Sequence, residues 1–332
     1  RKGLIEIIHL HREERKKGKI LSFEEVEVFN DSNIVLLGSG NIGGKGRGIA
    51  FLQAILSTSG LFNGLGNVNL KMPRTAIIGT DEFEYFINQN KLLKIALTED
   101  FNEIKNVFAK ASLSPRLEKQ LRKLLKILYK PLAIRSSSLF EDSIRQPFAG
   151  IFETYFIPNH HENFEERYRQ LTMAIKMVYA SVFSPVAKAY FQSVGFKIED
   201  EKMAVVIQEV VGSMYDNAYW YPHISGTAQS YNYYPLENME PEDGVAVLAL
   251  GLGKYVVEGE RAYRFCPKYP TVSVTSPKDE LKSTQTEFLA IDLRKKDFNL
   301  LEGEEATLVR LSLYEAEKHG TLKHLASTYD PN

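Results

Sequence analysis

A glycine-rich stretch, GSGNIGGKGRG at residues 38–48, limits what this chain can fold into. It follows an apolar run from Ile34 to Leu37 and precedes a pattern with helical spacing from Ile49 to Leu56. A strand, a tight turn and a helix are therefore expected in this order. Consecutive glycines leave backbone N–H groups unobstructed, and a helix N-terminus favours negative charge. The stretch therefore predicts an anion-binding loop, although a glycine-rich turn that binds nothing has the same composition.

Two known phosphate-binding motifs fit this stretch only in part. The glycines of GSGNIG match the G-x-G-x-x-G spacing of dinucleotide-binding folds, but those folds also need an acid about twenty residues later. No Asp or Glu occurs between Ser32 and Thr80, where every charged residue is basic. The G-x-x-x-x-G-K-[ST] motif fails because Ser39 replaces its first glycine and Gly46 its hydroxyl residue. Neither motif therefore identifies the ligand.

The composition sets limits on the class of protein. The 332 residues carry a net charge of -1 and a single cysteine, Cys266. Near-neutral charge argues against a surface directed at nucleic acid or an anionic membrane. One cysteine cannot form an internal disulfide, no apolar run approaches the ~18 residues of a membrane span, and no signal peptide opens the chain, so a cytoplasmic location is expected. Because Arg1 is not a start methionine, we expect a piece of a longer protein.

The pattern of apolar and turn-forming residues changes along the chain. Residues 1–32 predict a helical lead-in segment, and residues 33–200 a helix-rich lobe in which Ser114-Pro115 and Ser184-Pro185 mark helix starts. Residues 201–332 contain runs of β-branched and aromatic residues separated by Gly, Pro, Asn and Asp, which predict a strand-rich lobe. This segregation favours an α+β fold over one doubly wound sheet.

A second candidate site follows the run PLAIRSSS. Arg135 comes where an apolar strand ends, beside the polar residues Ser136 to Ser138. The planar guanidinium offers a fork of donors that suits phosphate oxygens. A surface loop, with an ion pair from Arg135 to Glu141 or Asp142, is the alternative interpretation of the same residues.

Five stretches together resemble a known family in their order and spacing. They are GGKG at 43–46, AIRSSSLFEDSIRQPFAGIFETY at 133–155, MAVVIQEVVG at 203–212, SGTA at 225–228 and GLGKYVVEG at 251–259. The chain resembles the N-terminal ATP-binding region of phosphoenolpyruvate synthase and pyruvate phosphate dikinase, which is similar to an ATP-grasp fold. In these enzymes ATP phosphorylates a histidine on a mobile domain, which carries the phosphoryl group to pyruvate at a separate barrel.

The resemblance implies an ATP site within residues 33–332. It implies that Lys45 and Arg135 hold the ATP phosphates and act in catalysis, and that the backbone from Gln208 to Val211 reads the adenine edge, with Glu209 on a ribose or amino group. The other residues implied for the nucleotide site are Gly43, Gly44, Gly46, Ser136, Gly251 and Gly253. Mg²⁺ is implied as well, with its ligands outside this chain.

The chain departs from the family pattern after Gly259. The acidic metal-binding pair and the Gln-x-Arg motif that usually follow are not matched, although EFLAID at 287–292 places acids on a strand-like run. None of the seven histidines has the Thr-Ser-His setting of the phosphohistidine domain, and no pyruvate barrel is present. The interpretation is an ATP-binding part of a dikinase-type phosphotransferase, truncated at its C-terminal end and inactive alone, whose phosphohistidine and pyruvate domains lie in the missing part or act in trans.

Two alternatives remain open at this point. The run SGTAQSYNYYP carries tyrosines and a glutamine where the family has an apolar, threonine-bearing run, which favours a non-catalytic nucleotide sensor or scaffold. The same ATP lobe also serves relatives with another acceptor, such as a glucan or an antibiotic. Acceptor choice resides in other domains, so the lobe alone does not separate these activities.

Overall fold

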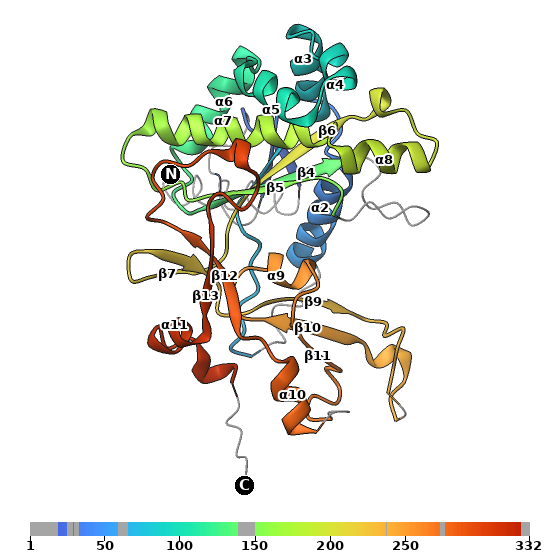
Figure 1. The fold of residues 1–332 in the computed structure, drawn as a ribbon, viewed down its shortest axis with the longest axis vertical. Coiled ribbons are helices and arrows are strands. Elements are labelled where there is room, and N and C mark those ends of the chain that lie inside the picture. Colours follow the sequence, from blue (N-terminus) through green and yellow to red (C-terminus); the bar gives the residue numbers. More distant parts are fainter. Residues whose placement is uncertain are drawn as a thin grey trace, which may run out of the picture. The chain divides into compact units, whose positions relative to one another are not determined.

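The described residues form two compact units (Figure 1). A computed structural model describes residues 19–24, 29, 33–58, 66–138, 150–236, 238–272 and 276–326. The first unit comprises residues 1–210 and 296–306, and the second comprises 211–295 and 307–332, each within those described ranges. Most of the predicted lead-in segment, and both Glu141 and Asp142, lie outside the described residues.

The first unit is built on a six-stranded mixed sheet in the order β1-β2-β3-β6-β4-β5. Strands β1, β2 and β3 pair in parallel, whereas β6 is antiparallel to β3 and β4, and β4 is antiparallel to β5. The strands are β1 (Ile20–Ser22), β2 (Ile34–Leu37), β3 (Thr75–Ile78), β4 (Leu132–Ser138), β5 (Thr154–Ile157) and β6 (Met203–Glu209).

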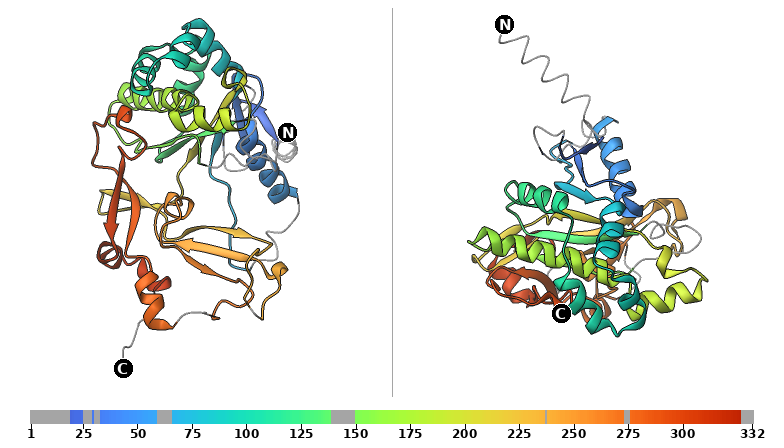
Figure 2. Two further views of the ribbon diagram at one scale, coloured as in Figure 1. Left: turned by 45° about the vertical axis from the view of Figure 1, so that its right-hand side comes forward. Right: turned by 90° about the horizontal axis from the view of Figure 1, so that it is seen from above.

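Helices cover both faces of this sheet. They are α2 (Gly43–Thr58), α3 (Thr80–Gln89), α4 (Leu93–Thr98), α5 (Phe101–Lys110), α6 (Pro115–Leu125), α7 (Phe164–Ser181) and α8 (Pro185–Ser193), with short 3-10 turns at Ile198–Asp200 and Leu300–Glu302. Helix α7 runs along one face together with α3, α5 and α6 (Figures 1 and 2), and their apolar side chains form the main core with every second strand residue. Helix α2 packs on the other face, over Ile34, Ile77 and Val206.

The predicted helix starts at Ser114 and Ser184 are confirmed. Each serine accepts a hydrogen bond through its hydroxyl from the backbone N–H three residues later, and a proline follows at the first helical position. A side-chain oxygen at this position satisfies a donor that has no partner within the helix, and the fixed φ of proline suits the first turn. Local capping chemistry thus sets these two boundaries.

The second unit contains two antiparallel sheets. One has the order β13-β12-β8-β7 and the other β11-β10-β9. The strands are β7 (Ser213–Tyr215), β8 (Tyr219–Tyr221), β9 (Ser225–Gln229), β10 (Val245–Ala249), β11 (Tyr263–Phe265), β12 (Glu287–Asp292) and β13 (Leu308–Ser312). The helices are α9 (Lys254–Val257), α10 (Pro277–Ser283) and α11 (Leu313–Lys318), with 3-10 turns at Pro241–Asp243 and Leu322–His324. The α+β class is therefore confirmed.

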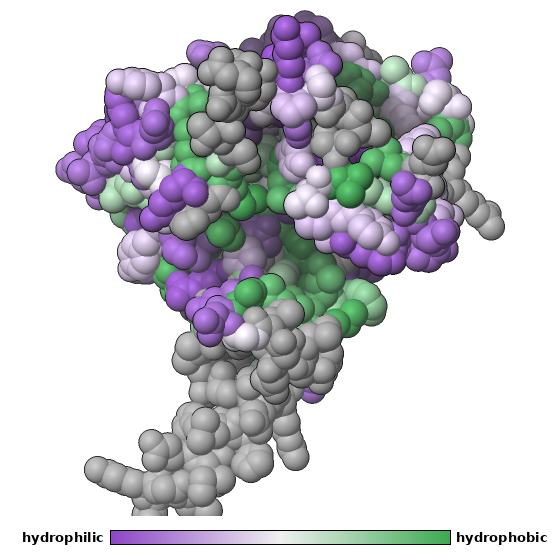
Figure 3. Space-filling view, turned by 90° about the horizontal axis from the view of Figure 1, so that it is seen from below, coloured by the Kyte–Doolittle hydropathy of each residue, from purple (hydrophilic) through white to green (hydrophobic). Residues whose placement is uncertain are grey.

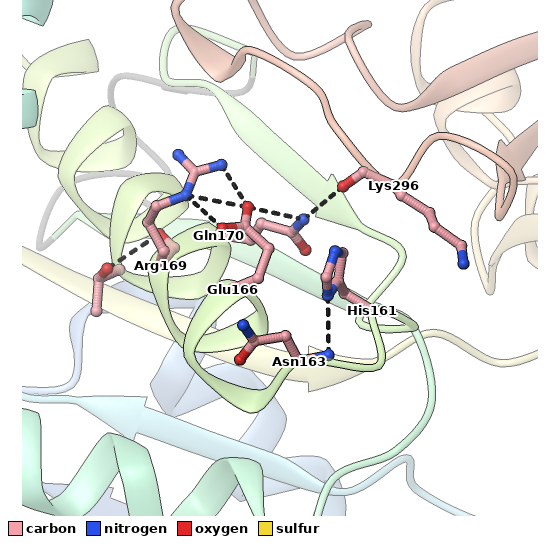
Figure 4. Close-up of polar contacts among 7 residues, drawn as sticks. His161, Asn163, Glu166, Arg169, Gln170 and Lys296 are labelled. Atoms are coloured by element: carbon pink, nitrogen blue, oxygen red, sulfur yellow. Dashed lines mark hydrogen bonds and ion pairs between the residues drawn. The ribbon is translucent and has the colours of Figure 1, made fainter.

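Two segments lie in a different unit from the one their position in the sequence suggests. Strand β6 opens the predicted strand-rich lobe, yet it belongs to the first unit because it pairs with β3 and β4 on its two sides. Residues 296–306 also return to the first unit. Their backbone is held by side chains of two helices, since Gln170 of α7 donates to the carbonyl of Lys296 at 2.9 Å (Figure 4) and Lys105 of α5 donates to that of Leu301 at 2.6 Å.

The surface of the described residues is mixed in polarity. Figure 3 shows hydrophobic residues exposed in several places between hydrophilic ones on the face that it draws. Exposed apolar side chains are normal on folded proteins and give no interface by themselves. Among the described helices, none is both long enough and apolar enough to span a membrane.

Candidate functional site

The first half of the glycine loop packs against neighbouring helices of the first unit. The N–H of Gly38 donates to Oε1 of Gln120 in α6 at 3.1 Å, and the hydroxyl of Ser39 donates to Oδ2 of Asp81 in α3 at 2.8 Å. Gly40 has a φ of +94°, and a Cβ there would lie 2.2 Å from Oδ1 of Asp81. These residues therefore form a turn between β2 and α2 that packs against α3 and α6, beside an acid rather than in a purely basic setting.

The second half of the loop is the start of a helix. Residues 43–48 were expected to lie in the loop, with helical spacing only from Ile49, but α2 begins at Gly43. The reason is that two N–H groups of its first turn find side-chain acceptors. Asn41 Oδ1 accepts from Gly43 at 2.9 Å, and the hydroxyl of Ser137 accepts from Gly46 at 3.0 Å. Such bonds offset the low helix propensity of the glycines.

Ser137 joins this helix start to strand β4. Its hydroxyl also donates to the carbonyl of Ile42 at 2.8 Å. Gly43 has a φ of +69°, and a Cβ on it would lie 1.9 Å from the carbonyl oxygen of Ser137. The N-terminus of α2 can therefore touch β4 only because residue 43 has no side chain.

The helix start delivers Lys45 to the strand that carries Arg135. Lys45 Nζ donates to the hydroxyl of Ser136 at 3.3 Å, although the two residues are 91 positions apart. Arg135 Nη1 donates to Oε1 of Gln208 at 3.5 Å, the long limit of a hydrogen bond, and Gln208 donates to the hydroxyl of Thr75 at 2.9 Å. Four of the predicted site residues thus form two hydrogen-bonded pairs, Lys45–Ser136 and Arg135–Gln208, at consecutive positions of β4.

Strand pairing places Arg135 and Gln208 on one face of the sheet. Arg135 lies opposite Val206, whose side chain packs under α2, and Gln208 follows Val206 by two positions on β6. Side chains two apart on a strand share a face, as do paired side chains. Glu209 alternates to the other face, where it lies opposite the core residue Leu132. Gln208 and Glu209 therefore do not point toward the same ligand.

The backbone implied to read the adenine edge makes contacts within the first unit. The N–H of Glu209 donates to the carbonyl of Arg74 at 3.1 Å, and the N–H of Val210 donates to that of Pro131 at 2.8 Å. These two donors are engaged in extending the sheet, and the side chain of Glu209 belongs to a residue that is only 7% exposed. These two N–H groups therefore do not face a ligand, and a role of residues 208–211 at an adenine edge stays a prediction.

Three predicted site residues belong to the second unit. Val211 is 61% exposed. Gly251 has a φ of +86°, and a Cβ there would lie 2.7 Å from the carbonyl oxygen of Leu289 in β12, which explains the need for glycine by packing within this unit. Gly253 precedes α9, and a Cβ on it would make only ordinary contact with Ser225. Their part in a nucleotide site stays a prediction.

The acids of EFLAID form ion pairs. Glu287 accepts from Arg310 at 2.8 Å, and Arg310 also reaches Glu260 at 3.0 Å. Asp292 accepts from both Nε and Nη2 of Arg294 at 2.9 Å, and this guanidinium lowers the pKa of Asp292. Each carboxylate is therefore balanced by an arginine, an arrangement that does not suggest a magnesium ligand.

The described residues form an α+β chain in which a glycine-rich helix start brings a lysine to a strand, at the residue that follows an arginine. Residues 39–321 match the family described as pyruvate phosphate dikinase, AMP/ATP-binding domain, and the chain belongs to this family. It is also similar to an uncharacterized phosphotransferase, YvkC, of Bacillus subtilis (strain 168), with 28% identity over 190 residues. That alignment includes 57% of this chain but only 20% of the relative, so the chain spans about a fifth of the relative's length. The resemblance to the dikinase ATP-binding region is thereby confirmed.

Proposed function

We propose that this chain binds ATP with its phosphates at the junction of α2 and β4, and that the protein containing it is a dikinase-type phosphotransferase. The observation that supports the proposal is the contact of Lys45 with Ser136, which brings a lysine of α2 to the residue that follows Arg135 on β4. Family membership supplies the ligand class, since the matching domain is an AMP/ATP-binding one. We further propose that the fold is ATP-grasp-like.

The chemistry of the junction suits a polyphosphate. During phosphoryl transfer negative charge is spread over the phosphate oxygens, and fixed cations that face it lower the barrier. Lys45 supplies a point charge, Arg135 a planar fork of donors, and α2 the positive end of a helix dipole with no acid in its first turn. We propose that Ser136 and the amides of Gly43, Gly44 and Gly46 complete the phosphate site.

The acceptor of the phosphoryl group is proposed to be a histidine on another domain. The relative YvkC is much longer than the aligned region, which leaves room for such domains in proteins of this kind. Mg²⁺ would accompany ATP and offset phosphate charge, but Glu287 and Asp292 are paired with arginines, so we assign it no ligand here. A glucan or an antibiotic as the final acceptor is equally compatible with this lobe.

Titration calorimetry with ATP, with and without Mg²⁺, tests the phosphate site. We expect Lys45→Ala and Arg135→Ala each to weaken ATP binding by about 1.5–3 kcal/mol, the scale of a hydrogen bond to a charged group. Lys94→Ala on α4 is the matched control, because it removes one exposed positive charge from the same unit without touching the junction. Binding that survives both site variants unchanged would refute the proposed phosphate site.

A second experiment separates an enzyme from a nucleotide sensor. Tyr233 and Tyr234 of the altered SGTAQSYNYYP run are 74% and 80% exposed, so this run does not contribute to a core. If the protein is a sensor or scaffold, it binds ATP without forming phosphohistidine. Acid-labile, base-stable label after incubation of the full-length protein with γ- or β-labelled ATP would support the phosphotransferase, and saturable binding without such label would support the sensor.

A further inference from the structure

A buried histidine and two carboxylates meet in the second unit. They are His319 at the end of α11, Glu315 one turn earlier, and Asp216 in the turn between β7 and β8. One ligand atom from each lies within 4.8 Å of the other two. The group is remote in sequence from the predicted phosphate site and has no part in the proposed function.

The imidazole of His319 is held in one orientation. Nδ1 lies 2.8 Å from the hydroxyl of Tyr221, and Nε2 lies 2.9 Å from Oδ2 of Asp216. The ring stacks on that of Tyr215, with centroids 5.1 Å apart and an angle of 21° between the planes. Only 2% of the side chain is exposed. Histidines that bind a metal through one ring nitrogen commonly hold the other nitrogen with a hydrogen bond to an oxygen. His319 has this arrangement, because Nδ1 lies against the Tyr221 hydroxyl and Nε2 faces the Asp216 carboxylate.

The hydroxyl of Tyr221 can act as donor or as acceptor toward Nδ1 of His319. When the histidine proton is on Nδ1, the Nδ1–H group donates a hydrogen bond to the Tyr221 hydroxyl. The lone pair of Nε2 then faces the Asp216 carboxylate. Two lone pairs in opposition are unfavourable, and a cation between them removes the conflict.

The backbone brings both carboxylates to the ring. Glu315 and His319 are four positions apart, and the N–H of His319 donates to the carbonyl of Glu315 at 3.0 Å, so one helical turn stacks the two side chains. Asp216 has a φ of +52°, a left-handed conformation that aspartate tolerates better than most residues. The Asp216 side chain is 64% exposed, which gives an ion access from solvent.

We propose that Asp216, Glu315 and His319 bind a divalent transition-metal ion, with Zn²⁺ favoured by the ligand set. One imidazole nitrogen and two carboxylate oxygens are ordinary zinc ligands, and three protein ligands leave a position for water. Zinc bonds of about 2.0–2.2 Å separate tetrahedral ligand atoms by roughly 3.4 Å. The three ligand atoms lie within 4.8 Å of one another, so the metal has to draw them together and to separate Nε2 from Oδ2 of Asp216, which now lie 2.9 Å apart.

One cation competes with the proposed metal. Lys318 Nζ donates to Oε1 of Glu315 at 3.0 Å, and half of the lysine side chain is exposed. The metal has to displace this ammonium from the carboxylate. Removing the lysine should therefore tighten metal binding, which a purely structural role of the three residues does not predict.

Titration of the chain with Zn²⁺ by calorimetry, and with Co²⁺ by visible absorption, tests the site. We expect one equivalent of Zn²⁺ to bind and Co²⁺ to give the intense d–d bands of a four- or five-coordinate site. Asp216→Asn and Glu315→Gln should each weaken Zn²⁺ binding at least about tenfold. Lys318→Met should strengthen it, and Glu317→Gln, an exposed glutamate on the same helix, should leave it unchanged.

Two results would overturn the proposal. One is the absence of stoichiometric Zn²⁺ binding by the wild-type chain, and the other is binding that Asp216→Asn and Glu315→Gln both leave intact. The two carboxylate variants are chosen because they preserve side-chain shape and avoid the buried His319, whose loss could unfold the unit. Calorimetric binding is measured without ATP, so failure here leaves the phosphate site unaffected.

Discussion

Individual glycines in α2 serve different purposes although they look alike in the sequence. Gly43 has a φ of +69° and contacts the backbone of Ser137, whereas a Cβ on Gly48 would meet nothing within 4 Å. We expect Gly43→Ala to separate the helix start from β4, which lowers the melting temperature and weakens ATP binding. Gly48→Ala should instead stabilise the protein by up to about 1 kcal/mol, because alanine favours a helix interior.

Thermal unfolding and ATP titration of the two variants side by side check this contrast. A Gly43→Ala protein that keeps both wild-type stability and wild-type ATP affinity would show that the close approach to Ser137 is dispensable. Equal destabilisation by both substitutions would show that glycine is needed throughout the helix start.

The Asp292–Arg294 pair makes stability depend on pH. The pKa of Asp292 is lowered in the folded state, so the ionised carboxylate stabilises the fold. This contribution is complete above the unfolded pKa of about 3.9 and is lost as the pH falls through the folded pKa. Because Arg294 is partly exposed and screened by solvent, Asp292→Asn should cost about 1–2 kcal/mol at pH 7.

The difference in stability between wild type and Asp292→Asn should shrink when unfolding is measured below pH 3.9. Urea unfolding of the two proteins at pH 7 and at pH 3 makes this comparison. A difference of the same size at both pH values would mean that the carboxylate charge does not contribute.

Residue identity predicted part of the candidate site. Lys45 and Arg135 were identified from their own chemistry and from the family pattern, and the structure brings Lys45 to Ser136, the residue after Arg135 on β4. The contact of Asp81 with Ser39 was missed, because it lies just beyond the stretch without acids that made the loop look purely basic. Ser137 gave no local signal either, since its role exists only when α2 meets β4.

At the scale of elements, side-chain caps were easier to predict than strand partners. Ser114 and Ser184 start helices through bonds to their own next turn, so the sequence alone identifies them. Strand β6 looked like the first strand of a strand-rich lobe, but its partners β3 and β4 lie far away in the sequence. Pairing between distant segments leaves no local pattern, which explains why the placement of this strand was not predicted.

Residues 296–306 are an element whose position depends on a few side chains. Gln170 is buried and its amide donates to the carbonyl of Lys296 (Figure 4), while Leu300 inserts into the main core with 2% exposure. We expect Gln170→Ala to cost about 1–3 kcal/mol, because it leaves that carbonyl without this donor. Faster amide exchange within residues 296–306 should accompany the loss.

Hydrogen exchange followed by mass spectrometry checks this prediction. Glu165→Ala is a control on the same helix α7, since the Glu165 side chain is exposed and pairs with Arg122 of α6 rather than with the segment. Unchanged exchange of residues 296–306 in Gln170→Ala would show that Leu300 holds the segment without the amide.

At the scale of the whole molecule, the two proposed ligands should give distinct footprints. ATP is expected to slow amide exchange in residues 43–46 and 132–138, which form the junction of α2 and β4. Zn²⁺ is expected to slow it in residues 215–221 and 313–321, which surround His319. Each ligand stabilises the region it binds because it binds the folded form only.

Exchange measured with each ligand alone and with both together makes this test. Protection of both sets of residues by either ligand alone would contradict the assignment of separate sites. Protection of neither set by ATP, together with retained ATP binding, would move the nucleotide elsewhere in the chain.

The return of residues 296–306 to the first unit has a consequence for synthesis on the ribosome. Phe298, Leu300 and Leu301 pack on the main core, yet they are translated after residues 211–295 of the second unit. Domains generally fold as they emerge, N-terminal part first. The nascent first unit must therefore wait, with part of its apolar surface uncovered, until about ninety further residues have been added.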